Sequence, residues 1–218
     1  MARAQRDIKF IMKNIIILSI SYIILLTANT NKSDLLPGLL KEGDIIFQES
    51  LSDQSKAIKL ATHSRYSHVG IIFKFNNQFQ VLEAVQPVTI TPLNKFINKG
   101  KNHHYVIKRL INYSSIIDQS AINKMKTYGK LFIGKNYDIY FEWSDERIYC
   151  SELVWKIYKN TLNIEIGKLE KLKDFDLNST VVKNLMKKRY GTNIPYNELV
   201  ISPESMFKSK YLLTVTSN

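Results

Sequence analysis

The chain has 218 residues, of which 44% are apolar and 11% aromatic, enough to form a folded core. This composition excludes a disordered chain and a collagen-like fibre. The single cysteine excludes an internal disulfide and therefore a disulfide-stabilised mini-protein. There are 31 lysine and arginine residues against 19 acidic residues, a net charge of +12. That charge would suit an anionic partner such as nucleic acid, a membrane surface or a cell-wall polymer.

The N-terminal segment has the pattern of an export signal. Residues 14–26 (NIIILSISYIILL) carry no charge, basic residues precede them, and a polar stretch follows at residues 27–34. The apolar run is shorter than the about 20 residues that a transmembrane helix needs. Ala28 suits a cleavage site, but Leu26 is large for its position there. We therefore expect residues 1–34 to be a signal peptide or an N-terminal membrane anchor; a buried core helix is the alternative.

The remainder, residues 35–218, is expected to form one domain. Strands dominate the first half and helices the second, which favours the α+β class. Asn76 and Asn77 separate two strand-like segments and predict a two-residue hairpin turn. The predicted strands are residues 45–47, 67–75, 79–85, 105–110 and 211–215, with an extended segment at 87–92. The predicted helices are residues 52–62, 116–132, 149–162 and 179–190.

Cys150 begins the predicted helix at residues 149–162 and lies on its apolar face. At a helix N-terminus, free backbone N–H groups and the positive end of the helix dipole favour a thiolate and lower the pKa of a thiol. Cys150 is therefore a candidate nucleophile. The competing interpretation is a small apolar residue on a face that packs into the core.

A cysteine nucleophile needs a base, and His68 is the best-placed candidate. If the two asparagines form the hairpin turn, Gly70 lies opposite Glu83, and His68 shares a sheet face with Glu83. A carboxylate at that position can hold an imidazole in one tautomer, and Gly70 leaves room for it. The alternative is an ordinary hairpin with a His–Glu hydrogen bond. The pattern does not show whether Cys150 approaches this hairpin.

The other candidate motifs are weaker. His63 ends a helix, and the adjacent His103 and His104 have poor spacing for zinc ligands. No phosphate-binding glycine loop or serine nucleophile elbow is present, so we expect no metal and no cofactor. The basic cluster at residues 183–189 is interpreted as a solvated helix face, so no nucleic-acid partner is expected.

These residues resemble the YiiX/YebB-like branch of the NlpC-type cysteine hydrolases, the circularly permuted papain-like amidases. The resemblance runs from about residue 42 to residue 216, and the histidine block precedes the cysteine block, as in the permuted branch. The matching stretches are GDIIF at 43–47, SHVGI at 67–71, LEA at 82–84, YD at 137–138, YCSELV at 149–154 and SP at 202–203.

The resemblance implies a permuted papain-like α+β fold, with a small antiparallel sheet packed on the helix that starts at the cysteine. It implies Cys150 as the nucleophile, His68 as the general base and Glu83 as the residue that orients His68. We expect an oxyanion hole that uses the backbone N–H of Cys150. Tyr137 and Tyr149 are candidates for a second donor, although both could be packing aromatics.

The expected activity is that of a cysteine peptidase or amidase acting on an amide, peptide or related acyl bond. The expected substrate is a cell-wall peptide or a lipid-linked acyl group, and the expected location is periplasmic, extracellular or anchored to a membrane by the N-terminal segment. Residues 162–190 match least and are expected to be an insertion that shapes the substrate groove. A lipid acyl hydrolase or acyltransferase at the membrane, and a non-catalytic ligand-binding module of the envelope, are the alternatives. The oligomeric state stays open.

Overall fold

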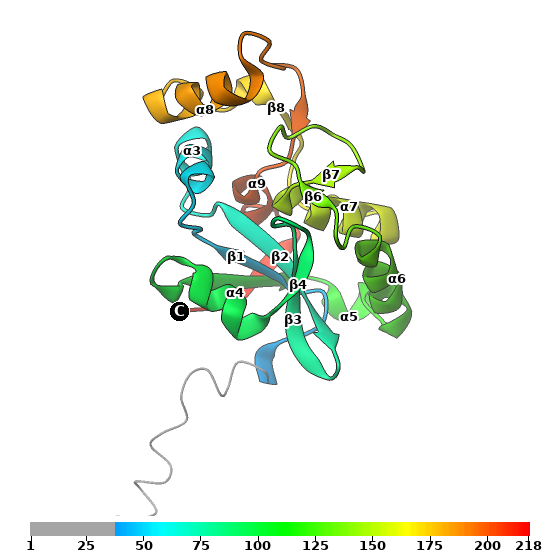
Figure 1. Cartoon of the computed structure of the whole chain (residues 1–218). Coiled ribbons are helices and arrows are strands. Elements are labelled where there is room, and N and C mark those ends of the chain that lie inside the picture. The colour runs from blue at the N-terminus through cyan, green and yellow to red at the C-terminus, as the bar shows by residue number, and fades with distance from the viewer. Residues whose placement is uncertain (1–37) are drawn as a thin grey trace, which may run out of the picture. The chain divides into compact units, whose positions relative to one another are not determined.

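Runs of branched apolar residues form a six-stranded antiparallel sheet in the order β10-β5-β1-β2-β3-β4 (Figure 1). The structure, a computed structural model, describes residues 38–218. The strands are β1 (Ile45–Gln48), β2 (His68–Phe75), β3 (Gln78–Glu83), β4 (Thr89–Pro92), β5 (Tyr105–Leu110) and β10 (Leu212–Ser217). The predicted strands are therefore all present, and the predicted extended segment contains a strand.

The hairpin of β2 and β3 has the predicted turn and register. Asn76 and Asn77 both have positive φ angles, 49° and 59°, as a type I′ turn requires. Phe75 pairs with Gln78, and the pairing continues without a bulge to Ile71 and Leu82. Because side chains alternate between faces, this register puts the first residue of β2 and the last residue of β3 on the same face.

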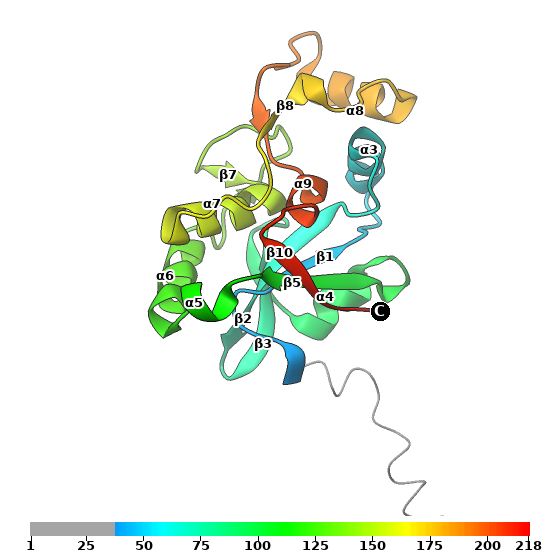
Figure 2. The same ribbon diagram turned by 180° about the vertical axis from the view of Figure 1, so that it is seen from behind.

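Seven helices begin and end within residues 38–218. They are α3 (Asp53–Thr62), α4 (Leu93–Lys99), α5 (Tyr113–Ile116), α6 (Gln119–Lys130), α7 (Cys150–Leu162), α8 (Thr180–Tyr190) and α9 (Pro203–Phe207). Ser52, Asp118 and Ser179 accept hydrogen bonds from the first turns of α3, α6 and α8, which explains where these helices begin. Figure 2 shows the same elements from behind, with β10 and β5 toward the viewer.

Two short strand pairs and two 3₁₀ turns complete the description. The strand β6 (Asn136–Tyr137) runs parallel to β7 (Arg147–Ile148), and β8 (Glu170–Lys171) runs antiparallel to β9 (Leu199–Val200). The 3₁₀ turns are η1 (Lys101–His103) and η2 (Leu172–Asp174).

The main core lies between α7 and one face of the sheet. Val69, Ile71 and Phe73 of β2 are fully buried and belong to the same apolar cluster as Leu153 and Ile157 of α7. Burying such side chains stabilises the fold by about 1.5–3 kcal/mol each. The predicted α+β arrangement, an antiparallel sheet packed on the helix that starts at the cysteine, is confirmed.

The predicted helix at residues 116–132 was wrong in its start. Ile117 has extended backbone angles, so α5 ends at Ile116 and α6 begins after its N-cap, Asp118. A carboxylate that bonds the first turn is a stronger start signal than the apolar spacing that suggested one long helix. The helices α4 and α9 were not predicted, because each is too short to show helical periodicity.

Helix α8 packs beside α3, so two segments far apart in the sequence form one wall (Figures 1 and 2). The backbone N–H of Asp176, which precedes α8, donates to the carbonyl of Ala61 in α3. The predicted leader at residues 1–34 lies outside the described residues and stays a prediction. Among residues 38–218, no helix combines the length and apolar character needed to cross a membrane.

Candidate active site

Cys150 is the first residue of α7 and is 2% exposed. The helix starts here because the Glu152 side chain accepts a hydrogen bond from the backbone N–H of Tyr149, at 3.3 Å, which satisfies a donor at the helix end. The backbone N–H groups of Val69 and Ser151 donate to the Cys150 sulfur. The sulfur therefore lies where backbone donors from a helix start and from β2 converge.

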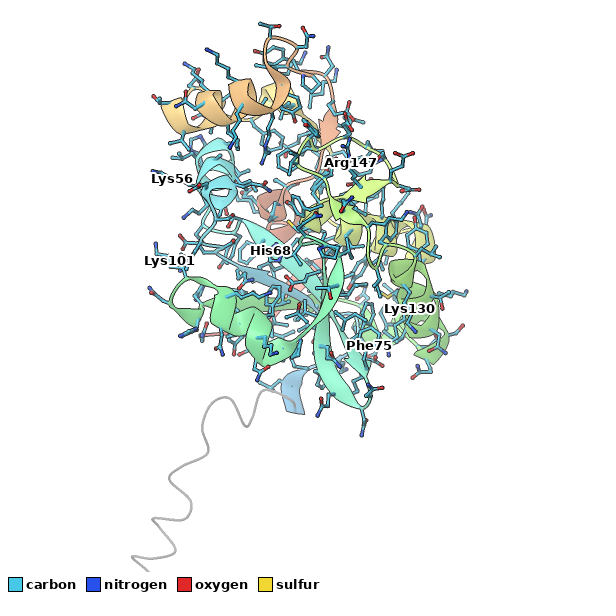
Figure 3. The ribbon with its side chains drawn as sticks, in the orientation of Figure 1. Lys56, His68, Phe75, Lys101, Lys130 and Arg147 are labelled. Atoms are coloured by element: carbon cyan, nitrogen blue, oxygen red, sulfur yellow. The ribbon has the colours of Figure 1, made fainter. Side chains whose placement is uncertain are left out.

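His68 begins β2 and is held on both sides. Its Nε2 lies 2.6 Å from Oε2 of Glu83. The ring stacks on Phe96 of α4, with centroids 5.5 Å apart. Figure 3 shows His68 near the centre of the molecule, at the start of the β2 ribbon. The hydrogen bond to Glu83 leaves Nδ1 as the ring nitrogen that can bond Cys150.

The Cys150 thiol and the His68 imidazole are hydrogen-bonded to each other. Burial alone would lower the pKa of His68, but the hydrogen bonds and negative charges of Cys150 and Glu83 raise it from 6.5 to about 10. Burial alone would raise the pKa of Cys150, but the hydrogen bond and positive charge of His68 and the backbone donors lower it. The two shifts together favour a thiolate–imidazolium pair.

Glu83 is 1% exposed and serves as an ionised partner. Burial acts to raise the pKa of Glu83, but the hydrogen bond and charge of His68, the Thr91 hydroxyl and the Lys99 charge lower it. Thr91 donates to Oε1 at 2.5 Å, and the Lys99 ammonium lies 3.7 Å from the same oxygen. A Cβ added to Gly70 would lie 3.4 Å from Cβ of Glu83, an ordinary contact distance, so the two positions are neighbours across the hairpin as predicted.

The two tyrosines that were candidates for a second oxyanion donor have different positions. Tyr137, on β6, is hydrogen-bonded to Cys150, and burial and the Cys150 charge raise the pKa of its phenol well above 10.0. The hydroxyl of Tyr149 instead accepts the backbone N–H of Ile201 at 3.1 Å. Of these two tyrosines, Tyr137 is therefore the one that is hydrogen-bonded to the sulfur.

The loop after β6 helps to fix Tyr137. The buried carboxylate of Asp138 accepts the backbone N–H groups of Tyr140, at 2.8 Å, and Glu142, at 2.6 Å. Phe141, which this turn carries at a positive φ of 53°, packs edge-on against Tyr149. The side chain of Asp138 therefore shapes the backbone that follows Tyr137.

Two pockets meet at this site, and Tyr137 lines both. The first has almost entirely apolar walls and reaches Cys150; α3, η2, α8 and the segment 200–203 form it. The second, called the polar pocket below, reaches His68 and Glu83, and most of its lining residues have polar side chains. The polar residues around the second pocket are Gln48, Ser50, Ser52, Gln54, Ser55, Ser67, Gln86 and Lys99.

The remaining histidines lie elsewhere. His63 forms a surface pair with Asp176 at 3.2 Å, and His104 Nδ1 donates to the carbonyl of Asn218 at 2.6 Å. Nowhere in residues 38–218 are three or more His, Cys, Asp or Glu side chains grouped to hold a metal ion.

The interpretation of residues 183–189 as a solvated helix face holds for the lysines but not for Arg189. Lys183, Lys187 and Lys188 are exposed, whereas Arg189 is half-buried and lines the apolar pocket. Its guanidinium donates to Oε1 of Gln54 at 2.5 Å. The last turn of α8 therefore points one of its basic side chains toward the site.

Sequence reasoning missed Gln54, Thr91, Phe96 and Arg189. Gln54 and Thr91 carry no motif, and Phe96 lies on a helix that was not predicted. Arg189 had a weak signal, because it lies in the last turn of a helix in which Val182 and Met186 mark a buried side. Residues at i, i+4 and i+7 share such a side, and Arg189 is at i+7 from Val182.

Residues 39–216 match the family described as "Permuted papain-like amidase enzyme, YaeF/YiiX, C92 family". The chain is 48% identical over 173 residues to the uncharacterized protein YiiX of Escherichia coli (strain K12), an alignment that covers 79% of this chain and 84% of YiiX. It is also similar to a solved structure, the crystal structure of metalloprotein yiiX from Escherichia coli O157:H7. That similarity has a TM-score of 0.78 and 46% identity, and covers 82% of this chain and 97% of the other.

Proposed function

This chain belongs to the permuted papain-like amidase family, and on that premise we propose that Cys150, His68 and Glu83 carry out its hydrolysis of amide bonds. The observation that supports this most directly is the buried hydrogen-bonded series from the Cys150 sulfur through His68 to Glu83. It supplies a nucleophile, a proton carrier and a group that orients the carrier.

In the proposed mechanism, the Cys150 thiolate attacks the carbonyl carbon and forms a carbon–sulfur bond, and the carbonyl electron pair moves to oxygen. The His68 imidazolium then gives its proton to the departing nitrogen, the carbon–nitrogen bond breaks, and a thioester remains on Cys150. A water molecule then attacks the thioester carbonyl carbon, and His68 removes a proton from this water. Breakage of the carbon–sulfur bond releases the acid and restores the thiolate–imidazolium pair.

The oxyanion needs two donors in this scheme. The backbone N–H of Cys150 is one, because it belongs to the first turn of α7 and has no partner within the helix. We assign the second to the Tyr137 hydroxyl, since it already lies at the sulfur. The Tyr149 hydroxyl accepts a hydrogen bond from the backbone N–H of Ile201, so we do not assign it as an oxyanion donor.

The two pockets support an orientation for the substrate. His68 gives its proton to the leaving group, so the leaving amine belongs on the His68 side, in the polar pocket. The acyl group then extends from Cys150 into the apolar pocket. Apolar walls favour a lipid-linked acyl group over a cell-wall peptide, because a peptide's amides would lose their hydrogen bonds to water there.

The same pocket supports a second candidate, a lipid acyl hydrolase or acyltransferase that cleaves an ester. Its leaving group would occupy the same polar pocket. We place either activity at the cell envelope, on the strength of the leader-like residues 1–34 and the net charge of +12, which suits an anionic surface. The solved relative is described as a metalloprotein. The donor groups in residues 38–218 of this chain do not cluster as a metal site, so the mechanism has no metal-dependent step.

The test uses the full chain with four substrates: octanoyl p-nitroanilide, acetyl p-nitroanilide, phosphatidylethanolamine vesicles and a muropeptide. We expect p-nitroaniline release from the octanoyl amide, and none from the Cys150→Ala variant. Lys130→Ala, an exposed change at the end of α6, is the control and should keep full activity. Turnover by Cys150→Ala at the wild-type rate would contradict the mechanism. Binding of a substrate without turnover would favour the ligand-binding module, and cleavage of the vesicles alone would favour the lipid acyl hydrolase.

A further inference from the structure

We propose that Arg189 and Gln54 are positioning residues that set the direction of a hydrogen-bond series, and so aim the Tyr137 hydroxyl proton at the reacting sulfur. This inference rests on the proposed amidase function. It joins the last turn of α8 to the chemistry at Cys150 through two side chains that no catalytic motif includes.

The series has three links. The Arg189 guanidinium donates to Oε1 of Gln54 at 2.5 Å. Nε2 of Gln54 donates to the Tyr137 hydroxyl oxygen at 2.7 Å. The Tyr137 hydroxyl in turn is hydrogen-bonded to Cys150, and the two side chains line the same apolar pocket. The links cross from α8 to α3, then to β6, then to the start of α7.

The chemistry of arginine fixes the direction of every link. A guanidinium has donors and no acceptor, so the Gln54 amide must turn its oxygen toward Arg189. Its NH₂ group then faces Tyr137, and an amide NH₂ can only donate. The Tyr137 oxygen therefore accepts, and its single proton is left for Cys150. The proton is directed at the sulfur in the resting enzyme and at the oxyanion during turnover.

The surroundings of Arg189 favour its hydrogen bond to Gln54. Its guanidinium lies over the ring of Phe141, 5.1 Å from the centroid, and beside the apolar pocket. Within the described part of the chain no carboxylate forms an ion pair with it, as the pairs found there involve other residues. A half-buried cation without a carboxylate partner is expensive unless it donates to a fixed acceptor, and here that acceptor is the Gln54 oxygen.

Two substitutions of Gln54 separate direction from packing. Gln54→Glu keeps the shape and can accept from both Arg189 and Tyr137, so it preserves both links but turns the Tyr137 proton away from Cys150. Gln54→Met has a similar length and loses both links, which leaves the Tyr137 proton free to reach Cys150. A merely structural role predicts that the methionine variant is the more damaged of the two.

The experiment measures kcat and KM on octanoyl p-nitroanilide, with the melting temperature as the readout of folding. We expect Gln54→Glu to lower kcat by roughly 10²-fold, as loss of one oxyanion donor does, with KM within about twofold of the wild-type value. The Tyr137→Phe variant should show the same loss. Gln54→Met should keep more of the wild-type kcat than Gln54→Glu, despite a lower melting temperature.

The double variant Gln54→Glu/Tyr137→Phe tests whether the charge of the new carboxylate, rather than the direction of the proton, lowers kcat. If the proton direction is what matters, Gln54→Glu causes no further loss in the Tyr137→Phe background. Wild-type kcat in Gln54→Glu, a greater kcat loss in Gln54→Met, or an equal loss from Gln54→Glu in the Tyr137→Phe background would overturn the inference. Those results would not contradict the proposed function. The proposed function is contradicted instead if Cys150→Ala retains turnover.

Discussion

Nε2 of His68 lies 2.6 Å from Oε2 of Glu83, at the open end of a two-residue hairpin, beyond the pair of Ile71 with Leu82. This contact assigns the two ring nitrogens of His68 to different partners, with Nδ1 left for Cys150. The carboxylate also carries a negative charge next to a ring that must hold a proton. Orientation and charge are two separate contributions of Glu83, and substitutions can separate them.

Glu83→Gln keeps an oxygen acceptor for Nε2 but removes the charge. We expect kcat on octanoyl p-nitroanilide to fall by roughly tenfold, and Glu83→Ala to lose more, because it also removes the acceptor. The pKa of His68 should fall in both variants. The alkaline limb of the kcat/KM profile should therefore move to lower pH, and an unmoved limb would show that the charge of Glu83 does not act on His68.

Alkylation by iodoacetamide tests the thiolate–imidazolium pair without any substrate. The pKa of Cys150 is lowered and that of His68 is raised to about 10. The pair should thus form as the pH rises through the lowered pKa of the thiol, and be lost as the pH rises through the pKa of His68. In His68→Ala, burial is no longer opposed by the imidazolium, so rapid alkylation should begin at higher pH. Identical pH profiles of the two proteins would contradict the pairing.

Gly70 is expected to tolerate no side chain. A Cβ there would lie 2.4 Å from Cγ1 of Val81 and 3.4 Å from Cβ of Glu83. Gly70→Ala should lower the free energy of unfolding in urea by about 1–3 kcal/mol, the usual effect of overpacking. It should also lower kcat, because the new Cβ would lie 3.0 Å from the carbonyl oxygen of Leu82, and a shift of this backbone would displace the adjacent Glu83. Gly38→Ala is the control, since a Cβ at Gly38 meets nothing within 4 Å; equal stability of the two variants would refute this account.

Filling the apolar pocket should change which acyl groups are accepted. Ala61, on α3, lines the pocket, and Ala61→Phe should raise KM for octanoyl p-nitroanilide by roughly tenfold or more. The acetyl amide, which does not extend into the pocket, should be unaffected. As the control, Lys56→Phe adds the same ring to α3 at an exposed residue that does not line the pocket; Figure 3 labels Lys56 on this helix. An equal effect on both amides would argue against an acyl site here.

The sequence predicts the parts of this site better than their assembly. Asn76 and Asn77 determine the hairpin register, which brings His68 and Glu83 to one face, because a two-residue turn leaves only one pairing. The start of α7 at Cys150 follows from local spacing in the same way. In each case the decisive interactions lie within a few residues of one another.

Tertiary packing decides the rest. Tyr137 lies on a strand of two residues, which is too short for any periodic signal. Gln54 and Arg189 are 135 positions apart, and only the packing of α8 beside α3 brings them together. A single sequence does not indicate which distant helices pack together. The helix that carries Arg189 was therefore interpreted as a surface helix, and Arg189 was not predicted as a site residue.

The permuted order of these residues has a consequence for biosynthesis. The hairpin with His68 and Glu83 spans 15 positions and can close early, as a local unit, while the chain is still being made. Cys150 follows only after α6, Arg189 later still, and β10 pairs with β5 at the very end. A thiolate needs its imidazolium partner and its helix start together. The proposed thiolate–imidazolium pair can therefore form only after the helix start at Cys150 has packed on a hairpin that comes much earlier in the chain, which makes reactivity of the sulfur a late product of folding.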